Sequence, residues 1–305
     1  MPAEIAFETC IDFELTIGES PVWDEEEGLL WFIDVLGPAA FTFDPVSKRV
    51  ARYPMPHEIG SLGLVNGGRI IVALRSGVHV FDPATGQMDF LVHPEPNQPM
   101  NRLNDGKVGP DGSFWVGSMH DAQPRQPTAS LYRVEPDGVV TTILGGLRVS
   151  NGLAWSPDGR TMYHSDSRGP VVRAFDFDPQ SGDVSNQRTI IVLDEERGLP
   201  DGAAVDVEGC YWSAGISAGV LNRFTAEGVL IETIELPIAA PTMPCFGGHD
   251  MKTLFVTSLT AERDGKRSAG TLIAFRTDVP GLSSYRLTQS RHRLQDDAPV
   301  SEIHD

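Results

Sequence analysis

The sequence predicts an all-β chain folded as a six-bladed β-propeller with four-stranded blades, and two observations lead to this prediction. One block occurs three times: a polar residue is followed eight residues later by the glycine of a turn, and then by a short β-branched or aromatic run. Looser copies give six blocks separated by about 41 to 50 residues, the period of a propeller blade. The blocks begin at Glu19, Gly60, Asn104, Asn151, Asp201 and Cys245. In addition, the sequence lacks the sustained 3.6-residue periodicity of apolar residues that would predict helices.

Each block predicts two strands joined by a hairpin, and a third strand follows it before a polar turn. The third strands are expected at Phe41–Pro45, Val78–Pro83, Ser130–Arg133, Val172–Asp176, Val220–Phe224 and Leu272–Phe275. The polar segment His120–Thr128 comes after such a hairpin and is expected to form a loop at the rim of a pocket. Residues 1–305 are therefore predicted to form a single propeller domain.

The two ends of the chain are expected to meet in one blade. The alternating run Ile5–Ile11 precedes the first block and has no blade of its own. A strand near residues 4–13 would complete the last blade beside Thr271–Phe275, because sharing a blade closes the ring and removes an open sheet edge. The tail after about residue 295 is polar, and Asp296–Asp305 is expected to be frayed.

Composition limits the classes of partner. The formal net charge of -18 disfavours nucleic acid and anionic membranes, so a small neutral or polar ligand is expected. The N-terminus lacks a signal-like pattern, and no apolar run reaches about 18 residues, which predicts a cytoplasmic protein. Three cysteines without a CxxC pair fit a reducing compartment. Nothing in the sequence indicates an oligomeric state.

The first residues of the six blocks are candidates for a site on the propeller axis. Residues one period apart occupy equivalent places in successive blades, so these positions should form a ring. The ring would hold two carboxylates, Glu19 and Asp201, and two carboxamides, Asn104 and Asn151. Such oxygen donors bind Ca²⁺, Mg²⁺ or Mn²⁺, or Zn²⁺ and Fe²⁺ with waters. Alternatively, Asn and Asp merely cap turns before glycine; four polar ring positions at once favour one divalent metal cation.

Four blocks carry a family resemblance across nearly the whole chain. GESPVW, NRLNDGKVGPDGSFWVGSM, SNGLAWSPDGRTMYHSDS and LPDGAAVDVEG resemble, in order, the signature blocks of the regucalcin/gluconolactonase (senescence marker protein) family of six-bladed lactonases. The resemblance implies that Glu19, Asn151 and Asp201 are metal ligands. It also implies that Arg102 and Asn104 bind substrate and that Asp201 is the general base.

One position departs from the animal members of this family. They carry an acidic substrate-contacting residue in the loop after GSM, whereas this chain has Ala122. The run from Ser118 to Asp121 is more similar to bacterial members that open aldonolactones. Because loops next to sites often carry function, His120 is expected to be a substrate-binding residue.

The predicted reaction is metal-dependent opening of a sugar-derived lactone of the gluconolactonase or pentonolactonase type to the aldonic acid. A cation at the ring would polarise the carbonyl and activate water, and Asp201 would relay the proton to the ring oxygen. Two alternatives remain: a non-catalytic propeller that binds a metal or small ligand, and another esterase or phosphotriesterase on the same scaffold. Ser217 lies in a GxSxG match, but a strand-like segment follows where a nucleophile elbow needs a helix.

Overall fold

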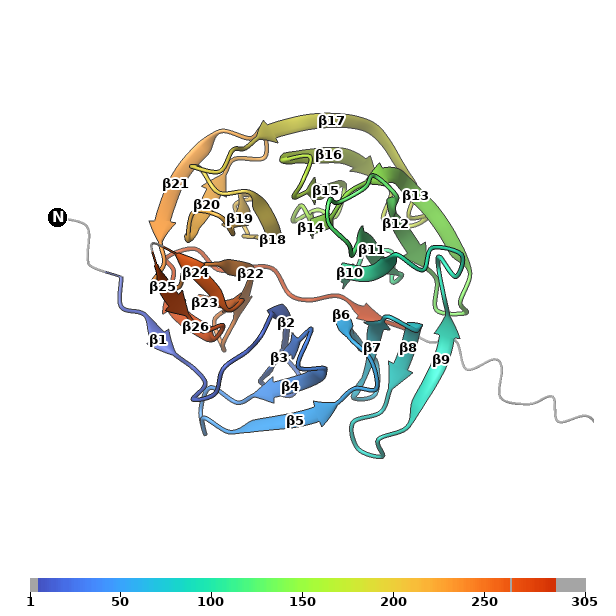
Figure 1. Ribbon diagram of the computed structural model, residues 1–305, viewed down its shortest axis with the longest axis horizontal. Helices are drawn as coiled ribbons and strands as arrows, with labels where there is room; N and C mark the ends of the chain where they lie inside the picture. The colour runs from blue at the N-terminus through green and yellow to red at the C-terminus, as the bar shows by residue number, and fades with distance from the viewer. Residues whose placement is uncertain (1–4, 264, 289–305) are drawn as a thin grey trace, which may run out of the picture.

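The computed structural model describes residues 5–263 and 265–288, and within them the regular elements are all β-strands. Six sheets stand around a central axis (Figure 1), which confirms the predicted six-bladed propeller. The strand order is β2-β3-β4-β5 in the first blade, and the next four blades follow the same inner-to-outer order. Among the described residues, no helix has the length and apolar character needed to cross a membrane.

The strands fall into four concentric layers. The innermost are β2 (Gly18–Asp24), β6 (Ile59–Val65), β10 (Asn101–Val108), β14 (Ser150–Trp155), β18 (Pro200–Val205) and β22 (Pro241–Gly247). The second are β3 (Leu29–Asp34), β7 (Arg69–Leu74), β11 (Phe114–His120), β15 (Thr161–Asp166), β19 (Tyr211–Gly215) and β23 (Thr253–Ser258). The third are β4 (Ala39–Phe43), β8 (Gly77–Phe81), β12 (Ala129–Val134), β16 (Val171–Phe177), β20 (Val220–Phe224) and β26 (Leu272–Arg276). The outermost are β5 (Val50–Pro54), β9 (Met88–Val92), β13 (Val140–Leu147), β17 (Val184–Val192), β21 (Leu230–Glu235) and β1 (Glu8–Thr9).

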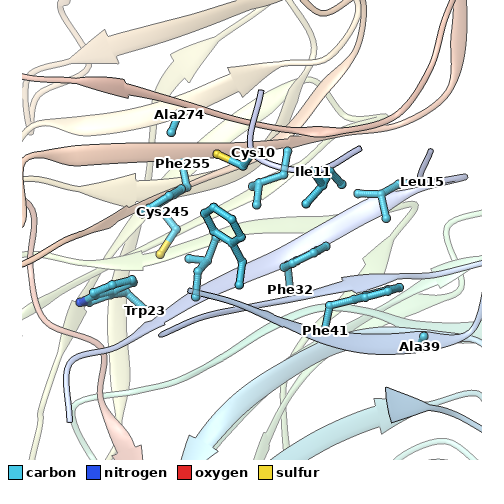
Figure 2. Close-up of a cluster of buried hydrophobic side chains, with 13 residues drawn as sticks. Cys10, Ile11, Leu15, Trp23, Phe32, Ala39, Phe41, Cys245, Phe255 and Ala274 are labelled. Atoms are coloured by element: carbon cyan, nitrogen blue, oxygen red, sulfur yellow. The ribbon is translucent and has the colours of Figure 1, made fainter. Parts of the chain in front are cut away.

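The hydrophobic core lies between neighbouring blades, and the burial of strand residues decreases from the innermost to the outermost strands. Every residue of β6 is buried, whereas β21 is almost entirely exposed. At the junction of the first and last blades, the Trp23 and Phe255 rings stack with their centroids 6.0 Å apart, and Phe32 packs in the same cluster (Figure 2). Burying a side chain of this size contributes roughly 2–3 kcal/mol, so each junction adds substantially to the cohesion of the ring.

The last blade is shared between the two ends of the chain, as predicted. β1 pairs antiparallel with β26, with Glu8 opposite Ala274 and Thr9 opposite Ile273. The paired strand has two residues and is therefore shorter than the alternating run Ile5–Ile11. A small hairpin, β24 (Ala261–Arg263) and β25 (Lys266–Ser268), is inserted between β23 and β26. The three cysteines, Cys10, Cys210 and Cys245, are buried and unpaired.

The chain after the last blade crosses one end of the axis, as Figure 1 shows. Gly281 bridges Asp206, and β27 (Arg286–Leu287) then pairs parallel with β6. The Arg286 guanidinium forms an ion pair with the buried Asp24. Residues 282–285 of this crossing segment line a cavity together with the inner strands. The predicted frayed tail Asp296–Asp305 lies outside the described residues.

A buried histidine next to the inner strands makes stability depend on pH. Burial, reinforced by the positive charge of Arg173, lowers the pKa of His164 to about 3, and its Nε2 lies 2.8 Å from the Ser150 hydroxyl. The folded state therefore excludes a proton that the unfolded chain binds below about pH 6.5. Stability is fully present above that pH and is lost as the pH falls towards 3.

We expect His164→Gln, which keeps a polar group but does not titrate, to flatten this dependence. Over pH 6 to 4, the free energy of unfolding of the native protein should fall more steeply than that of the variant, by about 1.4 kcal/mol per pH unit at most. Urea unfolding at several pH values measures both slopes. Equal slopes would show that His164 is already protonated in the folded protein.

Candidate functional site

Two hollows lie on the propeller axis, and their linings differ in chemistry. The cavity beneath the crossing segment is lined mainly by apolar residues of all six inner strands, with Lys107 as its one charged wall residue among those described. The pocket at the other end lies where the inner strands begin. Its polar lining residues are Glu19, Arg102, Asn104, Arg125, Asn151, Ser167, Arg168, Asp201 and Thr242. Only this second pocket combines several convergent polar and charged groups, so we take it as the candidate site.

Irregular backbone in the inner strands helps to present these side chains. The pairing register shifts at the start of each inner strand, for example between Glu19 and Val22 in β2 and between Asn151 and Ala154 in β14. Bulges of this kind turn side chains out of the regular alternation. Ser20, directly after Glu19, has a φ of 48°, a left-handed conformation that is uncommon for serine and marks a constrained site.

Glu19 and Asp201 bring two carboxylates into one enclosed space. Burial raises the pKa of Glu19 well above its usual value, and the charges of Asp201 and Asp105 add to the increase. Burial and the charge of Asp105 likewise raise the pKa of Asp201, whereas Arg102 and Arg168 oppose this. Burial and neighbouring negative charge both make the ionised form of these carboxyls unfavourable. A bound cation would offset this cost, so the pair indicates a cation site.

A chain of hydrogen bonds runs through the site from one blade to the next. Arg102 Nη1 donates to Asn104 Oδ1 over 2.9 Å, and Asn104 Nδ2 donates to Asn151 Oδ1 over 2.9 Å. Asn151 Nδ2 in turn donates to Ser167 Oγ and to Asp201 Oδ1. Four of the predicted site residues, Arg102, Asn104, Asn151 and Asp201, are thus in direct contact, and Glu19 lines the same pocket.

The chemistry of this donor set fits a hard or borderline divalent cation. Glu19 and Asp201 offer carboxylate oxygens, and Asn151 offers an amide oxygen once its side-chain amide is rotated by half a turn. Within the described residues, His, Cys, Asp and Glu side chains form no group of three suited to a metal. A metal here would therefore need the Asn151 amide as its third protein ligand, and its remaining positions would be open to water and substrate.

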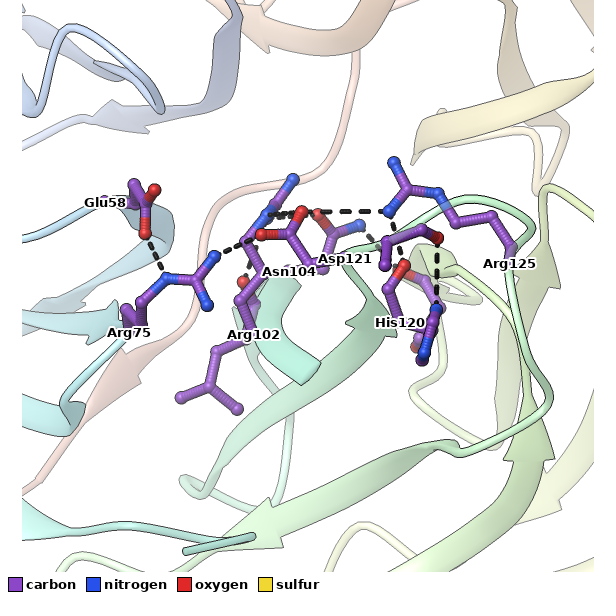
Figure 3. Close-up of polar contacts among 10 residues, drawn as sticks. Glu58, Arg75, Arg102, Asn104, His120, Asp121 and Arg125 are labelled. Atoms are coloured by element: carbon purple, nitrogen blue, oxygen red, sulfur yellow. Dashed lines mark hydrogen bonds and ion pairs between the residues drawn. The ribbon is translucent and has the colours of Figure 1, made fainter. Parts of the chain in front are cut away.

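A network of ion pairs includes two residues that line the pocket, Arg102 and Arg125 (Figure 3). Asp121 forms an ion pair with Arg75, and its Oδ1 lies 3.4 Å from Arg102 Nε and 3.7 Å from Arg125 Nη1. Glu58 forms a second ion pair with Arg75. Partial burial of Asp121 opposes its ionisation, but the Arg102 and Arg75 guanidiniums outweigh it and lower the pKa of that carboxyl. The network fixes Arg102, which is 9% exposed, against the substrate space.

The structure places His120 differently from the residues just described. His120 is buried, its Nδ1 lies 3.1 Å from the Ala122 carbonyl, and it is not among the lining residues of the pocket. Its backbone carbonyl accepts a hydrogen bond from Arg125. Its role in binding substrate stays a prediction. Among the described residues, His120 is connected to the pocket only through Arg125, which lines it.

One predicted ring position is wrong. Cys245 lies three residues further along β22 and lines the apolar cavity, whereas Thr242 lines the polar pocket. The physical reason is that the predicted register of this block relied on a turn without glycine, so nothing fixed its start. Gly60 contributes no side chain, and a Cβ there would lie 2.3 Å from the Leu103 carbonyl oxygen, so close packing explains that glycine.

Sequence reasoning missed several residues of the pocket. Arg125 lies in the predicted rim loop, together with Asp121, its ion-pair partner; the composition of the loop indicated where it lies but not what its side chains bind. Arg168 and Ser167 directly follow β15, at the end of the strand that pairs with β14. The signal that could have indicated them is position: residues after a second strand reach the same end of the blade as the first residues of its inner strand.

Comparison with known protein families gives one match over most of the chain. Residues 17–260 match the family model described as SMP-30/Gluconolactonase/LRE-like region. The chain is 37% identical to 6-deoxy-6-sulfogluconolactonase of Pseudomonas putida over 274 residues, which cover 88% of this chain and 93% of the relative. It is 36% identical to regucalcin of Xenopus laevis over 261 residues, covering 84% and 87% of the two chains.

A solved structure shares the architecture. The calcium-binding protein regucalcin from Agrobacterium tumefaciens superposes with a TM-score of 0.86 at 25% sequence identity. The superposition covers 93% of this chain and 97% of that one. The match therefore extends over the whole ring of blades and is not confined to a few of them.

Proposed function

The chain belongs to the SMP-30/gluconolactonase family, and from this premise we propose that it is a divalent-metal-dependent hydrolase that opens a sugar-derived lactone to its aldonic acid. A relative named 6-deoxy-6-sulfogluconolactonase, 37% identical over most of both chains, supports hydrolysis of sugar lactones. The observation that carries the proposal is the gathering of Glu19, Asn151 and Asp201 with Arg102 and Asn104 in one axial pocket.

We assign the metal to Glu19, Asn151 and Asp201. When bound, the cation would polarise the lactone carbonyl and lower the pKa of water. A calcium-binding relative supports a divalent cation, and the oxygen donors are compatible with Ca²⁺, Mg²⁺ and Mn²⁺, or with Zn²⁺ and Fe²⁺.

Asp201 is proposed to move the proton during ring opening. Water adds to the lactone carbonyl carbon, the bond from that carbon to the ring oxygen breaks, and the proton leaving water must reach the ring oxygen. Asp201 Oδ2 has no hydrogen-bond partner among the described residues, whether or not the Asn151 amide beside Oδ1 is rotated to bind the metal. Oδ2 can accept the proton from water and donate it to the ring oxygen.

Arg102 and Asn104 are proposed to hold the sugar hydroxyls. Among the described residues, the Arg102 side chain donates hydrogen bonds from Nη1 to the Leu103 and Asn104 oxygens, and its Nε faces Asp121. Nη2 is therefore left to donate to substrate. Orienting the ring in this way supplies part of the catalytic advantage, because the carbonyl carbon is then held near the attacking water.

A metal-reconstitution panel tests the proposal. The protein is stripped with a chelator, reloaded with Ca²⁺, Mg²⁺, Mn²⁺, Zn²⁺ or Fe²⁺ in turn, and assayed by acid release on aldonolactones of five- and six-carbon sugars. We expect turnover to disappear on chelation and to return with at least one ion. Metal binding without turnover of any lactone would instead identify a binding module, and preference for an aryl ester or phosphotriester would identify another hydrolase.

A further inference from the structure

Glu95 is a buried carboxylate outside the candidate site. It lies in the connection between β9 and β10, is 7% exposed, and is not among the residues that line the polar pocket. No cation of the described residues lies within ion-pair distance of it. Burying a charge without an opposite charge beside it costs free energy, so this glutamate needs a local reason.

One carboxylate oxygen of Glu95 accepts hydrogen bonds from three successive strands of the third blade. The donors to Oε2 are Asn101 Nδ2 in β10 at 3.2 Å, Ser118 Oγ in β11 at 3.1 Å and Tyr132 OH in β12 at 3.0 Å. Burial raises the pKa of Glu95, and these three hydrogen bonds oppose the increase. Because an ionised carboxylate can only accept, each of the three neighbours must turn a donor towards it.

The orientation that Glu95 imposes on Asn101 clamps the end of the rim loop, residues 120–128. With its Nδ2 directed at Glu95, Asn101 also donates from that atom to the Thr128 carbonyl over 3.1 Å. Its Oδ1 accepts a hydrogen bond from the Thr128 hydroxyl over 2.8 Å. If the amide were turned by half a rotation, the bonds to Glu95 and to the Thr128 carbonyl would be lost, because oxygen would then face oxygen.

The rim loop in turn carries charged side chains to the pocket. Arg125 lines the pocket, and its side chain donates to the His120 carbonyl at the start of the loop (Figure 3). Asp121 lies within ion-pair distance of both Arg102 and Arg125. The other end of the loop is the exposed Thr128, which the clamp described above holds. The position of Arg125 in the pocket wall therefore depends on attachments at both ends of the loop.

We propose that Glu95 is a positioning residue, which acts through Asn101 to hold the rim loop where Arg125 lines the polar pocket. The position of the loop is a property of the folded chain, and only the effect on substrate rests on the proposed function. Losing the acceptor at Glu95 should free the loop and thereby weaken binding of a sugar lactone. The ring-opening step should change little, because Glu95 does not reach the reacting atoms.

Limited trypsin digestion of the full-length protein measures the loop directly. A cut after Arg125 requires the loop to leave its attachments, and it gives fragments of residues 1–125 and 126–305 that mass spectrometry identifies. We expect Glu95→Leu, which removes the acceptor, to raise the rate of this cut at least about tenfold, since cleavage follows the population of the open loop. Glu95→Gln keeps an accepting oxygen but can also turn its amide, so its rate should lie between those of the native protein and the leucine variant.

Tyr132→Phe is the matched control. It removes another hydrogen bond to the same oxygen of Glu95 but leaves the bonds between Asn101 and the loop in place. The cut after Arg125 should therefore stay within about twofold of the native rate. Thr128→Val covers the case in which Glu95→Leu does not fold. This exposed change removes the hydroxyl bond to Asn101 and should speed the cut about threefold or more.

Steady-state kinetics extend the test to the pocket. On a sugar lactone, we expect Glu95→Leu to raise KM about five- to tenfold with kcat within about twofold of native, and Glu95→Gln to recover part of the loss. A native rate of cutting after Arg125 in Glu95→Leu or Thr128→Val, the same acceleration in Tyr132→Phe, or a fall in kcat with KM unchanged would overturn the inference. Failure of the native protein to open any lactone would overturn the proposed function, whereas the digestion rates would still decide the role of Glu95.

Discussion

Replacing Asp201 by Asn, or Glu19 by Gln, is expected to abolish lactone opening while leaving the propeller folded. Each change keeps the shape of the side chain but removes a negative charge from the pair that would hold the cation. We expect kcat/KM to fall at least about a hundredfold, which corresponds to about 2.7 kcal/mol of transition-state stabilisation. Acid release from an aldonolactone measures the loss, and metal titration of the same samples should show weakened binding.

Thermal unfolding separates this expectation from general damage. In the metal-free protein, burial and the negative charge of neighbouring carboxylates raise the pKa of both carboxyls, so removing one charge should not lower the Tm. The increase in Tm that metal produces in the native protein should be lost in both variants. Glu25→Gln, in the exposed turn between β2 and β3 of the first blade, is the matched control and should behave like the native protein. Activity above about a tenth of native would place the metal elsewhere.

The blades could be predicted from sequence because each repeat contains a turn whose backbone conformation favours glycine. Glycines at turns, such as Gly112 and Gly159 with φ of 75° and 68°, adopt conformations that other residues rarely adopt, so their spacing marks each hairpin. The last block lacks a glycine at that turn. Its start was therefore misplaced from Thr242 to Cys245, although its third strand and its pairing with the N-terminal strand were predicted correctly.

The pocket residues closest to the axis could also be predicted from sequence, whereas Arg125 and Arg168 in its wall could not. Glu19, Asn151 and Asp201 begin repeated blocks, so symmetry alone brings them to the axis. Arg125 comes from the loop after β11 and Arg168 from the turn after β15. Residues after the second strands of other blades, such as Val35, Ile216 and Leu259, also line the pocket, but the residue type at this place does not repeat around the ring. The meeting of Arg125 and Arg168 depends on the path of the rim loop, which Asp121 and the His120 carbonyl fix through contacts that no local pattern encodes.

Arg102→Ala is expected to separate substrate binding from chemistry. If Arg102 holds hydroxyl groups and does not touch the cation, the change should lower kcat/KM for sugar lactones by about ten- to a hundredfold, mainly through KM. A simple lactone without hydroxyls never makes these contacts and should lose much less. Steady-state kinetics on both substrates measure the difference, and metal titration should give the same affinity as in the native protein.

The hydrogen bond from Arg102 to Asn104 makes a second variant necessary, because losing it could disturb the amide chain that leads to Asn151 and Asp201. Arg102→Lys keeps a positive charge near Asp121 but lacks the planar fork that can serve Asn104 and a hydroxyl together. We therefore expect the lysine variant to bind metal normally and to recover only part of the sugar-lactone activity. Equal losses on both lactones, together with weaker metal binding in the alanine variant, would instead assign Arg102 to the support of the metal ligands and would overturn its role as a hydroxyl-binding residue.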